Sequence, residues 1–147
     1  MARHTAQQLG ITTISLYLVS MPISANRNQA LGCLLGGAVG DAWGGHWEGM
    51  AGPIDFRIPE KSWVSDDTQF TLATCESIIA CSAIDVEHLA AHFARKFKAG
   101  HFTGIGASTL KSMRELSAGV HWASAGSRGE FAAGNGAPCA WLLSHFF

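Results

Sequence analysis

The segment between residues 27 and 45 constrains the fold more than any other part of the sequence. It reads RNQALGCLLGGAVGDAWGG, and from Asn28 onward its leucine, valine and alanine residues recur at the three-and-four spacing of one helix face. Each glycine inside such a helix costs about 1 kcal/mol relative to alanine. We therefore predict a helix in which another backbone passes very close to the glycines, which are Gly32, Gly36, Gly37 and Gly40.

Three further helices are predicted downstream. Ser65 is the expected N-cap of an almost wholly apolar helix, and a helix that is apolar all round belongs at the centre of a fold. Asp85 caps the next helix, which carries an apolar stripe, and Gly100 ends it. Residues 106–116 form a short helix that stops at Gly119.

The remaining segments, 44–63 and 120–138, are rich in glycine, proline or serine and are predicted to be loops. No run of residues shows the strict alternation of a half-buried strand. We therefore expect a compact, multi-helix, all-α fold.

Composition narrows the range of partners. The 147 residues are 48% hydrophobic and only 14% charged, whereas about 25% is typical of a soluble domain. A chain of this length is one domain or part of one. So apolar a composition is typical of the interior of a larger protein, or of a protein that covers one face with a partner. The net charge of -1 gives no reason to expect nucleic acid or a membrane as a partner. The scattered cysteines contain no C-x-x-C pair, so we interpret them as core residues in a reducing compartment.

Residues 1–26 are expected to be an N-terminal extension, either disordered or non-native ahead of a start at Met21. The stretch from Ile11 to Ala25 is mildly apolar and resembles a weak signal peptide, but four hydroxyl side chains interrupt it. It is too short and too polar to span a membrane. A cytoplasmic location is therefore favoured over export.

Two adjacent acids, Asp66 and Asp67, stand in the stretch SWVSDDTQF. At a helix start each acid complements the helix dipole, which is worth about 0.3–1 kcal/mol. That interpretation explains one acid better than two, because desolvated like charges raise each other's pKa. A hard cation removes the conflict, since Mg2+ and Mn2+ prefer the oxygen ligands that Asp66, Asp67 and Ser65 offer. Spacing alone leaves both interpretations open.

Other motifs are weaker when taken singly. Glu48, in HWEGM, is either an acid at the rim of the fold or a third oxygen donor to the cation site of Asp66 and Asp67. GNGAP, residues 134–138, is either a turn or a backbone nest that faces phosphate oxygens. GGAVGD lacks the pattern of a nucleotide loop. His88 and His92 lie four residues apart without the glutamate of H-E-x-x-H, so we expect structural histidines.

Taken in chain order, four segments resemble the N-terminal half of the ADP-ribosylglycohydrolases. They are RNQALGCLLGGAVGDAWGGHWEG, SWVSDDTQFTLATCESI, FTGIGASTLKSMREL and AAGNGAP, and together they lie within residues 27–138. The family includes the dinitrogenase reductase-activating glycohydrolase and the ADP-ribosyl-arginine and ADP-ribosyl-serine hydrolases. The resemblance implies an all-α fold with two Mg2+ or Mn2+ ions in a central cleft. It also implies hydrolysis of the bond that joins ADP-ribose to a protein side chain or a small molecule.

The resemblance also implies roles for particular residues. Ser65, Asp66 and Asp67 match metal ligands of the family, and both aspartates are assigned to the catalytic centre. Glu48 matches a glutamate near the metals that is implicated in catalysis. Two loops match substrate-side loops of the family, and their matching residues are Gly104, Gly106, Gly134, Asn135 and Gly136. Some members carry a catalytic aspartate at the position where this chain has Gly104.

The family completes its metal site with a late D-x-D-T-type segment, which this chain lacks. Residues 139–147 read CAWLLSHFF instead of the family continuation. From Pro138 onward the tail can be written in codons that, read from the third base, encode MRVAPLAF, which is that continuation. Our hypothesis is a frameshift that truncates the protein and impairs its hydrolase activity. A non-catalytic ADP-ribose-binding module and an inactive gene remnant are the alternatives. The linkage cleaved and the oligomeric state are left open.

Overall fold

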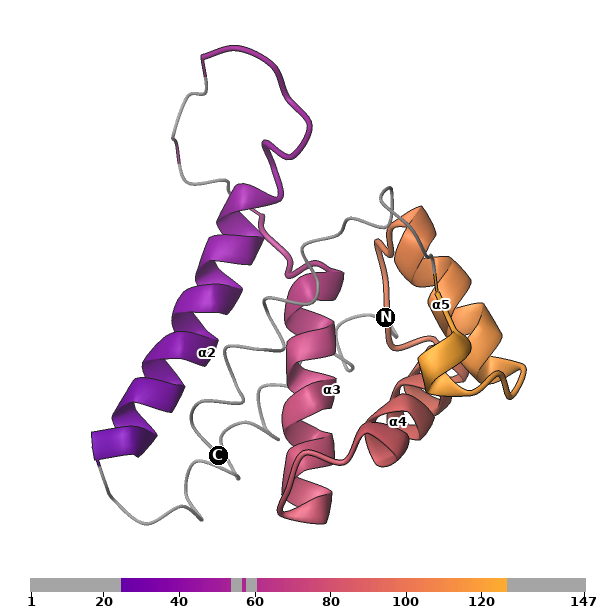
Figure 1. The fold of residues 1–147 in the computed structure, drawn as a ribbon. Coiled ribbons are helices and arrows are strands. Elements are labelled where there is room, and N and C mark those ends of the chain that lie inside the picture. Colours follow the sequence, from indigo (N-terminus) through magenta and orange to yellow (C-terminus); the bar gives the residue numbers. More distant parts are fainter. Residues whose placement is uncertain (1–24, 54–56, 58–60, 127–147) are drawn as a thin grey trace.

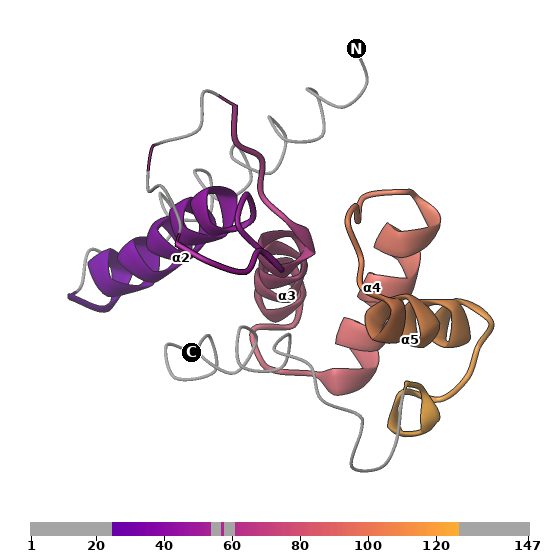
Figure 2. The same ribbon diagram turned by 90° about the horizontal axis from the view of Figure 1, so that it is seen from above.

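The computed structural model describes residues 25–53, 57 and 61–126 of the chain. These residues form helices and no strand, which confirms the predicted all-α class. α3 lies between α2 on one side and the α4–α5 pair on the other, as both views show (Figures 1 and 2). The elements are α2 (Ala25–Gly44), α3 (Asp66–Cys81), α4 (Val86–Lys98), α5 (Ala107–Ser117) and the 3-10 helix η1 (Trp122–Ser124).

Local signals in the sequence set the ends of these helices. The Ser65 hydroxyl caps α3 by accepting a hydrogen bond from the Asp67 amide at 3.2 Å. Asp85 caps α4 by accepting from two amides of its first turn, at 3.0 and 2.9 Å. Gly100 and Gly119 follow the ends of α4 and α5 with φ values of 72° and 88°, the left-handed conformation that favours glycine. The predicted starts and stops of these helices are confirmed.

The hydrophobic core lies where α3, α4 and α5 meet. Ala73 is fully buried there, together with Phe102 and Met113. The Phe70 ring stacks on Phe102 with 4.0 Å between centroids and meets the edge of Phe93 at 5.1 Å. Such pairs add to the free energy gained from apolar burial. Since α3 contacts α2 as well as α4, its predicted central position is confirmed.

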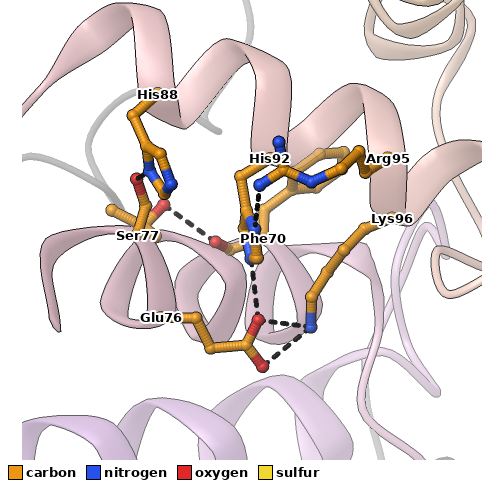
Figure 3. Close-up of polar contacts among 8 residues, drawn as sticks. Phe70, Glu76, Ser77, His88, His92, Arg95 and Lys96 are labelled. Atoms are coloured by element: carbon orange, nitrogen blue, oxygen red, sulfur yellow. Dashed lines mark hydrogen bonds and ion pairs between the residues drawn. The ribbon is translucent and has the colours of Figure 1, made fainter. Parts of the chain in front are cut away.

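Polar side chains also join α3 to α4, through a row of hydrogen bonds and an ion pair (Figure 3). The Glu76 carboxylate binds His92 Nε2 at 2.8 Å and Lys96 Nζ at 2.7 Å. The nearly inaccessible Ser77 hydroxyl pairs with His88 Nδ1 at 2.7 Å. Both histidines therefore bond to partners on α3, which is the structural role predicted for them.

The cysteines in the described part of the chain are unpaired, and only one is fully buried. Cys75 lies in α3, where burial, followed by the neighbouring Glu76 charge, raises the pKa of its thiol to about 12. Cys33 and Cys81 are half-buried. The prediction that the cysteines are core residues is confirmed for Cys75, while Cys139 lies outside the described residues.

The interpretation of the α2 glycines is wrong for the part of the chain that the structure describes. No atom lies within 4 Å of a Cβ built at any of the four glycines, so no backbone passes close to them. α2 instead turns Ala30 inward, while the side chains of Leu35 and Val39 are 51% and 64% exposed. GGAVGD lies within α2 and is helical, but the close packing expected at its glycines is absent from the described part of the chain.

Two smaller points concern the predicted loops and the membrane. The region from residue 120 contains η1 within its described part, so that part is not wholly irregular, and residues 127–138 lie outside the description. Among the described helices, none combines the length and the apolar character needed to span a membrane.

We predict that Met113→Ala lowers the free energy of unfolding by about 2–3 kcal/mol, because it leaves a cavity in the core. Met50→Ala is the matched control, since Met50 is 63% exposed and its loss is expected to cost less than about 0.5 kcal/mol. Urea unfolding followed by circular dichroism measures both. Equal effects of the two substitutions would contradict the assignment of the core.

Candidate functional site

The end of α2 is joined to the start of α3 by a carboxylate that the sequence analysis did not single out. Asp41 Oδ2 accepts hydrogen bonds from the Ser65 amide at 2.8 Å and from the Thr68 hydroxyl at 2.5 Å. Thr68 is buried and Asp41 is half-buried. The signal that could have identified Asp41 is its charge, because it is an isolated acid within an apolar, glycine-rich helix.

Asp66 and Asp67 are the first two residues of α3, directly after the cap Ser65. All three are half-buried. The structure thus confirms the predicted helix start and places both acids at the positive end of the helix dipole.

The electrostatics of Asp66 show that this helix start is crowded with negative charge. Burial raises the pKa of Asp66 above its ordinary value of 3.8, and a backbone hydrogen bond opposes that effect. The charges of Asp67, Asp41 and Glu48 raise the pKa further. We call these four residues, Asp41, Glu48, Asp66 and Asp67, the acidic cluster.

Glu48 reaches the acidic cluster from the turn that follows α2. The Trp47 amide donates to the Gly44 carbonyl at 2.9 Å, and the Met50 amide donates to the Trp47 carbonyl at 3.0 Å. Gly49, at φ 75°, allows the chain to reverse there. Glu48 itself is exposed, so its carboxylate is accessible to solvent and to a ligand.

The loop that contains Gly104 and Gly106 lies beside the same end of α3. The Gln69 side chain donates to Thr103 Oγ1 at 2.9 Å and accepts from the Thr103 amide at 2.7 Å. Gly104 has a φ of 77°, and Gly106 is the N-cap of α5. The sequence analysis missed Gln69, because a contact across 34 residues leaves no local signal.

The structure therefore brings most of the predicted site residues to one end of α3. Glu48, Ser65, Asp66 and Asp67 approach it with Gly104 and Gly106, whereas Gly134, Asn135 and Gly136 lie outside the described residues.

The donors at this site suit Mg2+ or Mn2+ in their chemistry, because carboxylate and hydroxyl oxygens are the ligands that hard cations prefer. Burial, and then the neighbouring carboxylates, raise the pKa of Asp66 and so disfavour its charged form, and a bound cation would offset both effects. The described residues nevertheless contain no group of three or more His, Cys, Asp and Glu side chains arranged to hold a metal ion. They fit part of a metal shell rather than a complete one.

We predict that Asp66→Asn stabilises the metal-free protein at pH 7. A carboxyl whose pKa is raised by folding adds stability that is fully present below pH 3.8 and is lost as the pH rises through its folded pKa. The variant avoids that loss, so its advantage over the wild type should shrink on acidification. Urea unfolding between pH 4 and 7 without divalent ions measures the difference.

Glu87→Gln is the control for this prediction, because Glu87 is an exposed acid in the first turn of α4. It should bring no gain in stability, since an exposed acid there interacts favourably with the helix dipole. A decrease in stability of Asp66→Asn at pH 7 would contradict the electrostatic account.

Comparison with known proteins identifies the family to which the chain belongs. Residues 22–142 match the family model described as ADP-ribosylglycohydrolase. An uncharacterized protein of Archaeoglobus fulgidus is 33% identical in an alignment 109 residues long, which covers 64% of this chain and 35% of that protein. This chain thus spans about a third of the length of that relative. No solved structure matches. The family match covers most of the sequence, and the chain belongs to the ADP-ribosylglycohydrolase family.

Proposed function

We propose that this chain supplies the Glu48–Asp66–Asp67 side of a metal-dependent hydrolase that removes ADP-ribose from a protein side chain or a small molecule. The observation that carries the proposal is the acidic cluster at the start of α3, where burial and three neighbouring carboxylates raise the pKa of Asp66. Membership of the ADP-ribosylglycohydrolase family supports the same chemistry.

Ser65, Asp66 and Asp67 are the residues that would hold Mg2+ or Mn2+, with Glu48 beside them. Two such ions, when bound, would orient the ribose hydroxyls and favour ionisation of a water molecule. Asp66 and Asp67 lie on the first turn of α3, so the backbone that carries their carboxylates is fixed before a ligand arrives.

Glu48 is the proposed general base. Hydrolysis adds the oxygen of water to C1 of the ribose while the bond from C1 to the leaving group breaks. The water must lose a proton in this step, and the exposed Glu48 carboxylate is accessible to accept it. The departing side chain or small molecule takes up a proton in turn.

The loop with Gly104 and Gly106 is the proposed substrate side of the site. A Cβ built at either glycine meets no atom of the described residues within 4 Å, so the backbone there is open to a ligand. Glycine at these positions lets a ribose or phosphate group approach the main chain closely. Gln69 holds this loop beside the acidic cluster through Thr103.

A second candidate function is an ADP-ribose-binding module without metal chemistry. One observation favours it: the part of the chain described by the structure lacks a set of three side chains arranged around a metal ion. For the same reason we expect the hydrolase activity of this chain to be weak.

Calorimetric titration with ADP-ribose, with and without Mg2+, separates the two functions. We predict binding that requires Mg2+, accompanied by slow release of ADP-ribose from an ADP-ribosylated protein. Replacing Asp66 and Asp67 by asparagine should abolish both, because metal binding needs their charges.

The matched control replaces Asp85 and Glu87 by Asn and Gln, which removes two charges from the start of α4 and keeps a good cap. It should retain wild-type binding. Binding that is independent of Mg2+ and of the aspartates would support the second candidate, and no binding at all would refute both functions.

A further inference from the structure

One oxygen of Asp41 holds both ends of the turn that carries the two acids. Its hydrogen-bond donors are the amide of Ser65, the N-cap, and the hydroxyl of Thr68, the third residue of α3. Asp66 and Asp67 lie between these two points. Both acids are therefore fixed relative to α2, the helix that leads to Glu48.

This arrangement replaces a contact that many helices make within themselves. In a capping box, an acid or amide at the third helical position reaches back to the amide of the N-cap residue. Here that position is Thr68, whose hydroxyl donates to Asp41 instead. Asp41 then accepts from the N-cap amide, so an acid on α2 performs the task of a residue within α3.

The opposite side of the same turn is also held. Gln69 bonds to Thr103 of the loop that precedes α5, and its side chain donates weakly to the Val64 carbonyl at 3.4 Å. With Asp41 on one side and Thr103 on the other, the first turn of α3 has little freedom to rotate. Hydrogen bonds to a charged acceptor are the stronger ones, so Asp41 is the firmer of the two anchors.

We propose that Asp41 is a positioning residue that sets the orientation of the Asp66 and Asp67 carboxylates for a divalent cation. It acts through the geometry of the α3 turn rather than through its own charge. The inference rests on the proposed metal-dependent function, and it adds to that function a residue that holds the metal-binding turn in place.

The test compares three variants of the full-length chain. Asp41→Ala removes the acceptor, Asp41→Asn keeps an acceptor oxygen but removes the charge, and Thr68→Val removes one donor with little change of shape. Asp85→Ala is the control, because Asp85 accepts from two amides at the start of α4, far from the acidic cluster in sequence.

Two measurements are made on each variant. Amide hydrogen exchange at residues 65–69 reports whether the turn is held, and it needs no metal. Titration with Mn2+, followed by electron paramagnetic resonance, reports the affinity for the cation. Exchange within α4 shows whether each variant is folded.

We expect Asp41→Ala to speed exchange at residues 65–69 and to weaken Mn2+ binding by about 10- to 100-fold, as is usual when a group that orients a metal ligand is lost. Thr68→Val should do the same to a smaller extent. Asp41→Asn should keep both hydrogen bonds in a weaker, uncharged form, so its exchange and affinity should stay closer to the wild type than to Asp41→Ala. Asp85→Ala should affect exchange only at the start of α4.

The proposal is overturned if Asp41→Ala leaves exchange and affinity unchanged. It is equally overturned if Asp41→Asn loses Mn2+ as fully as Asp41→Ala, because the charge of Asp41 would then be what matters. Failure of the wild type to bind Mn2+ would instead refute the proposed function, and the exchange data would still decide whether Asp41 holds the turn.

Discussion

The hydrogen bonds that Asp41 accepts from Ser65 and Thr68 are the interaction on which the candidate site depends. Among the residues of α2 whose burial is described, 27–44, Ala30 alone is buried, and the Leu35 and Val39 side chains are largely exposed, so α2 has little other connection to the described core. Because Glu48 follows α2, its position relative to the acids of α3 is set by this link.

The site contains a conflict between stability and charge, because a half-buried carboxylate lies near three other acids. Around Phe70 and Phe102 the side chains are apolar and well packed, whereas one helix turn away Asp66 is half-buried among like charges. A stable core beside an electrostatically unfavourable cluster is typical of functional sites, where ligand binding rather than folding relieves the strain.

Sequence reasoning found those parts of the fold that local signals determine. The caps Ser65 and Asp85 and the stops Gly100 and Gly119 each follow from the chemistry of a few neighbouring residues. The two hydrogen-bonded contacts that assemble the site could not be predicted from local sequence. Asp41 bonds to Ser65 across 24 residues, and Gln69 bonds to Thr103 across 34. The close backbone contact expected at the α2 glycines is absent from the described residues, because helix periodicity does not say which face of a helix a neighbour covers. The predicted site residues 134–136 lie outside the described part of the chain.

The central claim is that a divalent cation neutralises the paired acids at the start of α3. The most direct measurement is the broadening of backbone amide signals in nuclear magnetic resonance spectra as Mn2+ is added, because paramagnetic broadening falls steeply with distance from the ion. The account predicts that broadening begins at residues 65–69 and reaches Glu48 and Gly104, while the first turn of α4, which pairs with the opposite end of α3 through His88 and Ser77, is unaffected. Broadening centred elsewhere, or equal along the whole chain, would contradict it.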